Sequence, residues 1–333
     1  MPRPMQKEPR NRGTIGSRPL DWVFIGFCFL VLSYFWRPWN YLTPAAVLIL
    51  AINFIIVALL LRWADGFERE PLQTVIWGIT WGAFPAIFIA LLLSKATTPL
   101  LIAAVVEEFA KLIGVYLVFR RGSIHSATDA LVMGGYVGLG FTIFEDFAYS
   151  VGNNQPLNIL IFRGIFSVFA HALFSGIGAA LMYLLWRRME FSGVVLGFIC
   201  SYLIHFLWNF SLSIDLMSIS FLLSVIIYSI APPVALFLTC QFVRRREVAD
   251  LRSKGSAAVE SGLIAYEDLE EILNPSHRRK KLKTLQTRAD KRNYRKDIQA
   301  SARRVLEIDR DDTSETYSDF GFNSTQQADD PWA

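Results

Sequence analysis

The apolar stretch LIAAVVEEFAKLIGVYLVF at residues 101–119 is long enough to cross a bilayer, yet it carries two adjacent carboxylates, Glu107 and Glu108. A carboxylate at the centre of a membrane helix costs about 2.5–3.5 kcal/mol on insertion scales. Lys111 lies one helical turn beyond both and supplies a partner for them. The stretch therefore predicts a membrane helix whose charged side chains serve a purpose other than packing.

The rest of the chain repeats the apolar pattern between a polar N-terminal tail and a polar C-terminal end. Hydrophobic residues make up 53% of the 333, and the apolar segments are about 17–25 residues long, the length of a membrane span. We expect an all-α polytopic membrane protein with about eight transmembrane helices and a cytoplasmic C-terminal tail. The expected spans are about 21–39, 43–62, 73–94, 99–119, 127–150, 159–186, 191–213 and 218–243.

Positive charge alternates between the connections of these spans and orients the chain. Arg and Lys are frequent in the N-terminal tail, in every second connection and in the C-terminal flank, and they are sparse in the other connections. Because positive charge favours the cytoplasmic side, both termini of this integral cell-membrane protein are predicted to be cytoplasmic. The expected parts are an N-terminal tail at 1–20, a transmembrane domain at 21–243 and a basic tail at 244–333.

Ionisable side chains within the membrane gather in four consecutive expected spans. They are Glu107, Glu108 and Lys111, then Glu145 and Asp146, then Arg163 and His171, and lastly His205. Glu107, Glu145 and the two histidines lie about 5–12 residues from the outer ends of their spans, at 1.5 Å per residue. All of them fall in the outer half of the bilayer or near its midplane, and this shared depth predicts one common pocket.

Spacing within the spans also places polar groups in pairs on one helix face. Side chains four residues apart are neighbours on a helix, and three pairs have this spacing. The pairs are Glu107 with Lys111, His171 with Ser175, and His205 with Asn209. A histidine with an amide one turn away suits acid–base work or the binding of an oxyanion. A self-neutralised polar cluster or a proton path would use the same residue types.

This ordered set of motifs resembles the PrsW family of intramembrane proteases, which is related to the CAAX prenyl endopeptidase and ABI membrane proteases. The resemblance covers about 65–213. It rests on Glu107-Glu108-Phe109-Ala110-Lys111, on Gly138-Leu139-Gly140-Phe141 with Glu145, on Arg163 with His171 and Ser175, and on His205-Phe206-Leu207-Trp208-Asn209. The chain departs from the family pattern at Asp146, where Asn is more usual, and at Ser175, where Thr is commoner.

The resemblance implies an endopeptidase that cuts membrane-anchored proteins near the outer membrane face, in the best-known family role an anti-sigma factor in site-1-type cleavage. Peptide hydrolysis needs an activated water, an oxyanion holder and a proton donor. We expect Glu107 to be the general base, with Glu108 as the alternative and Lys111 orienting the pair. His205 with Asn209 would stabilise the oxyanion, and His171 with Glu145 would position water or carry protons.

A metal-dependent version of this site uses some of the same residues. Two histidines and one glutamate with an open water position form a known catalytic zinc arrangement, and Glu145, His171 and His205 offer that count. The sequence does not choose between the two versions. Zinc fits the donor types, and the metal-independent version is slightly favoured.

A different class of function uses buried Glu and His chains as well, namely a proton-coupled transporter or channel. Transporters often show a duplicated half and paired broken helices, and neither is visible in this sequence. A non-catalytic scaffold whose tail is the working part is a further alternative.

The C-terminal tail contains an expected short helix at about 265–274, followed by a basic block. The basic residues are Arg278, Arg279, Lys280, Lys281, Lys283, Arg288, Lys291, Arg292, Arg295, Lys296, Arg303 and Arg304. Such a block favours anionic lipid headgroups as partners. Tyr294 alone interleaves with it, so nucleic-acid binding is not expected. The acidic end at about 309–333 is predicted to be disordered.

Overall fold

The computed structural model describes residues 15, 18–36, 43–65, 70–94, 100–121, 124–151, 156–189, 191–213 and 220–307. All regular elements in these ranges are helical. By length and composition, five of the described helices can cross a membrane, and two shorter helices are also apolar. The prediction of an all-α polytopic membrane protein is confirmed. The count of eight crossings stays a prediction, and the predicted disorder at about 309–333 lies outside the described residues.

The chain divides into two compact units, residues 1–245 and 246–333. The first unit contains α1 (Leu20–Trp36), α2 (Pro44–Ala64), α3 (Leu72–Trp81), the π-helical segment η2 (Gly82–Ala86), α4 (Ile87–Leu93), α5 (Leu100–Arg120), α6 (Ala127–Val151), α7 (Pro156–Phe166), α8 (Ala170–Met189), α9 (Phe191–Ser213), α11 (Phe221–Ser224), the π-helical segment η3 (Val225–Ile230) and the first part of α12 (Ala231–Glu260). Because Pro85 within η2 lacks an N–H group, the wider π-helical turn keeps α3 and α4 in one continuous rod.

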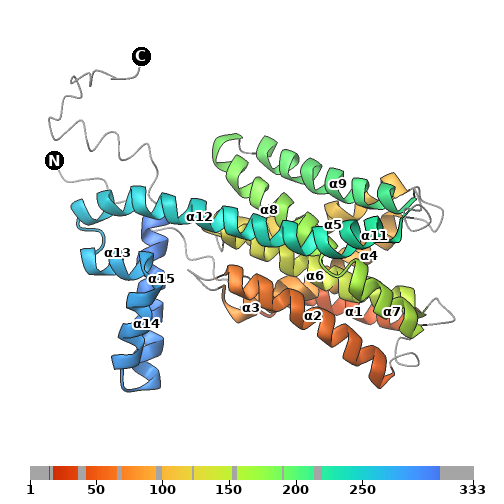
Figure 1. The fold of residues 1–333 in the computed structure, drawn as a ribbon, viewed down its shortest axis with the longest axis horizontal. Helices are drawn as coiled ribbons and strands as arrows, with labels where there is room; N and C mark the ends of the chain where they lie inside the picture. Colours follow the sequence, from red (N-terminus) through yellow and green to blue (C-terminus); the bar gives the residue numbers. More distant parts are fainter. Residues whose placement is uncertain are drawn as a thin grey trace, which may run out of the picture. The chain divides into compact units, whose positions relative to one another are not determined.

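Helix α6 is the central helix of the first unit. It packs against α2, α3, α5, α7 and α8, and α8 packs in turn against α9 (Figure 1). Within its most apolar window α6 is 89% buried, whereas the corresponding window of α2 is 22% buried. The outer helices therefore present apolar surface outwards, as lipid-facing helices do, while α6 holds its side chains inside the protein.

Glycines in α6 let α8 approach at backbone distance. A Cβ atom at Gly138 would lie 2.2 Å from the carbonyl oxygen of His171, and one at Gly134 would lie 2.3 Å from that of Ser175. Backbone atoms cannot withdraw as a flexible side chain can, so only glycine fits at these two crossings. This contact fixes the height of His171 on α8 relative to α6.

The expected single span at about 159–186 is wrong, because the structure has two helices there, α7 and α8, separated by a turn at 167–169. The hydroxyl of Ser167 donates to the carbonyl of Arg163 at 2.9 Å, a local bond that competes with helix continuation. With 11 residues, α7 is about 16 Å long and too short to cross a bilayer. The break places His171 in the first turn of α8.

The last expected span ends near residue 243, but helix α12 continues to Glu260. Hydropathy marks where apolar residues stop, whereas the helix continues through residues that are polar and good helix formers.

Asp65 and Glu70, at the two ends of the acidic connection before α3, contact each other. The Asp65 carboxylate pairs with Arg62 at 3.1 Å and accepts the backbone N–H of Glu70. Burial, with the carboxylates of Asp129 and Asp65 nearby, raises the pKa of Glu70 well above its usual value.

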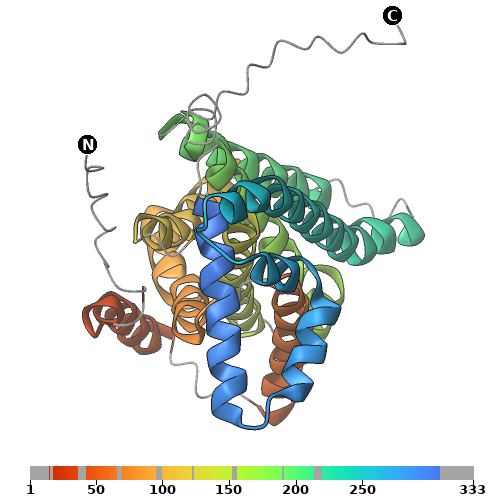
Figure 2. The same ribbon diagram turned by 90° about the vertical axis from the view of Figure 1, so that its left-hand side faces the viewer.

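The second unit contains the end of α12, α13 (Tyr266–Leu273), α14 (Pro275–Thr284) and α15 (Arg288–Glu307). Helix α13 matches the helix expected at about 265–274, and Asn274 caps α14 by accepting the backbone N–H of Ser276. Figure 2 shows α14 and α15 joined at one end by their short connection. The small apolar core of this unit is formed by Leu251, Ala258, Ile264, Leu269, Ile272, Ile298, Ala302 and Val305.

We expect Gly138→Ala to destabilise the protein by about 1–3 kcal/mol, because the added Cβ overlaps the backbone of α8. Gly26→Ala in α1 is the matched control, since a Cβ there meets nothing within 4 Å. Thermal unfolding in detergent measures both variants. Equal melting temperatures for the two would contradict the close packing of α6 against α8.

Candidate active site

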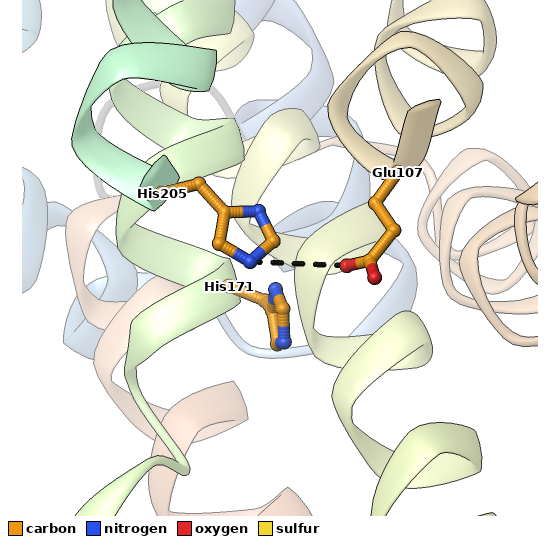
Figure 3. A group of neighbouring side chains, drawn as sticks. All are labelled: Glu107, His171 and His205. Carbon is orange, nitrogen blue, oxygen red and sulfur yellow. Dashed lines mark ion pairs between the residues drawn. The ribbon is translucent and has the colours of Figure 1, made fainter. Parts of the chain in front are cut away.

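The charged residues predicted to share one level in the membrane do meet between α5, α6, α8 and α9. Figure 3 shows Glu107 from α5, His171 from α8 and His205 from α9 pointing toward one another. Glu108 and Lys111 lie directly beside them, and Glu145 reaches His171 from α6. The structure thus brings together six of the seven residues that the sequence singled out for catalysis.

Glu108 is the fixed charge of the cluster. Its side chain is fully buried and accepts hydrogen bonds from Lys111 Nζ at 2.5 Å, Ser201 Oγ at 2.5 Å and Ser175 Oγ at 3.1 Å. His205 Nδ1 lies 2.9 Å from the same carboxylate. With four partners on its two oxygens, Glu108 has little capacity left to bind a substrate or a water.

Glu107 lacks the hydrogen bonds that its neighbour Glu108 accepts. Its Oε2 atom is buried and has no hydrogen-bond partner among the described residues. The same atom lies 4.0 Å from Lys111 Nζ and 3.8 Å from His205 Nε2, and the side chain is 18% exposed. A buried carboxylate oxygen without a partner is costly, so Glu107 is the carboxylate that is ready to accept a proton, a water or an ion.

The two histidines are held in defined orientations by their neighbours. His171 Nδ1 lies 3.0 Å from Lys111 Nζ, and its Nε2 lies 3.0 Å from Glu145 Oε2. Because an ammonium group only donates, Nδ1 of His171 accepts and Nε2 donates to Glu145. His205 donates from Nδ1 to Glu108, which leaves its Nε2 lone pair directed toward Glu107.

Arg163 of α7 pairs with the two carboxylates that α6 contributes to the cluster. Its guanidinium donates to Glu145 Oε2 at 2.5 Å and to Asp146 Oδ1, and it lies 4.4 Å from the centre of the Tyr149 ring. Asp146 is thereby paired, although its Oδ2 atom has no hydrogen-bond partner among the described residues.

Carboxylates outnumber cations in this cluster. Among the residues that the structure describes, Glu107, Glu108, Glu145 and Asp146 pair with two cations, Lys111 and Arg163, so two negative charges are left over when both histidines are neutral. In an apolar surrounding an excess of this size is compensated by bound protons or by a divalent cation.

The described residues contain one group of His, Cys, Asp or Glu side chains close enough to hold a metal, and it is Glu107, His171 and His205, with ligand atoms within 4.8 Å of one another. This set differs from the set expected from sequence, which had Glu145 in place of Glu107. Ligands of tetrahedral zinc lie about 3.3 Å apart for bonds of about 2.0–2.1 Å. The 3.8 Å between His205 Nε2 and Glu107 Oε2 is close to that spacing.

Two further residues show what sequence reasoning missed or could not place. Ser201, which binds Glu108, was not singled out, although it lies one turn before His205 on the same face of α9. Asn209, one turn after His205, is half-buried and makes no hydrogen bond among the residues that the structure describes. Its amide is therefore free to bind a substrate.

The different surroundings of the two glutamates predict different effects on stability. Glu108→Gln removes the partner of a buried ammonium group and should destabilise the protein by about 3–5 kcal/mol. Glu107→Gln removes no hydrogen bond from Oε2 and should leave the melting temperature nearly unchanged. Thermal unfolding of the two variants in the same detergent makes the comparison, and an equal loss in both would contradict this division of roles.

Comparison with known proteins assigns the chain to a family. A family model described as "PrsW family intramembrane metalloprotease" matches residues 70–237, about half of the chain. No curated protein and no solved structure matches. The matched range contains all the residues of the cluster described above. With its long apolar helices and this match, the chain is an integral multi-pass membrane protein and belongs to the PrsW family of intramembrane proteases.

Proposed function

We propose that this protein hydrolyses peptide bonds of membrane-anchored proteins and that Glu107 is the residue that activates the attacking water. The observation that carries the proposal is the contrast on α5: Glu108 is saturated by four partners, whereas Glu107 keeps a buried oxygen without one, next to two histidines. An acceptor beside oriented imidazoles suits general acid–base chemistry.

The other residues of the cluster fill the remaining roles. Glu107 takes a proton from water as the water attacks the carbonyl carbon. His205 holds that water through its Nε2 lone pair, and the Asn209 amide donates to the oxygen on which negative charge develops. The leaving amine receives the proton that Glu107 has taken from the water, and His171, which Lys111 and Glu145 hold in place, helps to position the water. Glu108 and Lys111 are positioning residues that act through the two imidazoles.

A metal ion, which the family description implies, fits the same place. Glu107, His171 and His205 would hold it, and the two excess negative charges match a dication. When bound, such an ion supplies hydroxide at neutral pH and polarises the carbonyl group. His171 would exchange its contact with Lys111 or with Glu145 for the metal.

The substrate that this site supports is a protein segment within the membrane. The cluster lies among apolar helices, and the pattern of positive charge predicts that both termini are cytoplasmic and that the cluster lies in the outer half of the bilayer. Cleavage near the outer face follows from that depth. A membrane-anchored anti-sigma factor, the substrate that the family resemblance suggests, has this topology.

Purified wild-type protein in liposomes should cleave members of a panel of single-pass membrane proteins. Glu107→Gln and His205→Ala should each lower the initial rate at least about 100-fold, because each removes a group that acts in the transition state. Gel-based assay of the products measures the rate, and the melting temperature of Glu107→Gln shows that its fold persists. A Glu107→Gln variant with more than about a tenth of the wild-type rate would contradict the assigned role.

Metal content, measured by mass spectrometry on the same preparations, tests the metal-dependent version. One zinc per chain, lost in Glu107→Gln and His171→Ala but kept in Glu145→Gln, would support Glu107, His171 and His205 as ligands. Loss in Glu145→Gln and retention in Glu107→Gln would support the set expected from sequence instead. Full cleavage by metal-free protein would establish the glutamate-dependent version.

We also propose that the basic helices α14 and α15 bind anionic lipid headgroups. The described side chains of Lys280, Lys281, Lys283, Lys296 and Arg304 are exposed, and basic residues near a membrane gain about 1 kcal/mol each from an anionic surface. In nanodiscs, anionic lipid should slow trypsin cleavage within α14 of the full-length protein several-fold relative to zwitterionic lipid. The protection should disappear in 0.5 M salt, at roughly a 4 Å screening length. Equal cleavage in both lipids would refute the proposal.

A further inference from the structure

The reacting groups are covered in this structure, so a substrate reaches them only after some element moves. The side chains of His205 and His171 are 3% and 7% exposed, and that of Glu107 is 18% exposed. A peptide carbonyl must approach these groups to about 3 Å for hydrolysis. Exposures this small leave little surface of these groups for an extended peptide segment to contact.

Four of the helices around the site are held too tightly to be the moving element. Helices α6 and α8 touch at backbone distance through Gly138, and α8 and α9 do so through Gly197, where a Cβ would lie 2.7 Å from the carbonyl oxygen of Gly178. Helix α5 is tied to α8 and α9 through the buried Glu108. Separating any of these pairs would dismantle the site itself.

Helix α7 is the exception. It has only 11 residues and is separated from α8 by the turn at 167–169. Its inner side packs through Leu160 against Leu50 and Phe147, and Gly164 lies against the side chain of Asn53 on α2. Its outer side carries the exposed apolar residues Ile161, Phe162 and Ile165. Movement of α7 would thus open the site sideways, toward the hydrocarbon of the bilayer.

The side chain of Arg163 connects α7 to the charged residues of the site. Arg163 binds Glu145 and Asp146 on α6, and Glu145 in turn binds His171. We propose that α7 is the gate through which a substrate segment enters the site from the bilayer, and that Arg163 is the positioning residue that closes it. This inference rests on the proposed peptidase function, which it deepens by naming the entry route.

The hydrogen-bonding needs of Arg163 indicate which acceptors a substrate must supply for the gate to open. A guanidinium group that leaves two carboxylates in an apolar medium needs other acceptors. The backbone carbonyls of an unwound segment provide them, because they have lost their own helical partners, and Arg offers five donors in a fixed plane. The gate would therefore favour membrane segments that unwind easily, such as those with glycine or helix-breaking residues.

A reversible crosslink between α2 and α7 tests the gate. In a variant whose native cysteines are replaced, Asn53→Cys and Gly164→Cys place two thiols at neighbouring positions, since a Cβ at Gly164 would lie 3.0 Å from Asn53 Cγ. We expect oxidation to lower the cleavage rate at least about 10-fold and reduction to restore it. The matched control is the pair Leu61→Cys and Gly135→Cys, which links α2 to α6 and does not include α7, since a Cβ at Gly135 would lie 3.4 Å from Leu61 Cγ. Oxidation of the control pair should leave the rate unchanged.

A distance measurement that does not depend on proteolysis separates failure of the gate from failure of the proposed function. Spin labels at the exposed positions Ile161 on α7 and Leu207 on α9 report the position of α7 by pulsed electron resonance. Arg163→Gln should add a second distance population that is absent from Arg163→Lys.

The outcomes are distinct. Undiminished cleavage by the oxidised α2–α7 pair overturns the gate and leaves the peptidase intact. If no form of the protein cleaves any substrate, the peptidase proposal fails, and a single distance population in Arg163→Gln then overturns the gate as well.

Discussion

The burial of the Glu108 carboxylate among apolar helices is the constraint on which the rest of the site depends. No bulk water reaches this group, so its charge is tolerated only because Lys111, His205 and two serine hydroxyls surround it. These partners come from three helices, and satisfying one carboxylate therefore fixes the relative positions of α5, α8 and α9. The same contact sets which nitrogen of His205 is free.

Close helix packing and this polar network support each other. The glycines of α6 bring α8 near enough for Glu145 to reach His171, and the backbone contact leaves little space for water that would weaken the ion pairs. Glu107 lies at the edge of the network with one oxygen unpartnered. Of two carboxylates adjacent in sequence, Glu108 is thus held by four partners and Glu107 keeps an oxygen available to a ligand.

Much of this could be predicted from the sequence because membrane burial makes charge conspicuous. Apolar length gave the helices, and the shared depth of Glu107, Glu145, His171 and His205 indicated one cluster. The division of roles between Glu107 and Glu108 could not be predicted, since both have the same spacing to Lys111 within a turn and only the facing helices distinguish them. The contact of Ser201 with Glu108 could not be predicted, because a single serine in an apolar helix usually bonds its own backbone. The break between α7 and α8 could not be predicted from hydropathy, which contains no information on the hydrogen bond from the Ser167 hydroxyl to the backbone.

The central claim is that this cluster hydrolyses peptide bonds within the membrane, with Glu107 activating the water. The most direct test is mass spectrometry of the products formed from a single-pass substrate in liposomes prepared in H₂¹⁸O. The account predicts one cut inside the apolar segment, one ¹⁸O atom in the new carboxyl terminus, and no such product with the folded Glu107→Gln variant. The same labelled product from Glu107→Gln, or a cut confined to the soluble part of the substrate, would contradict it.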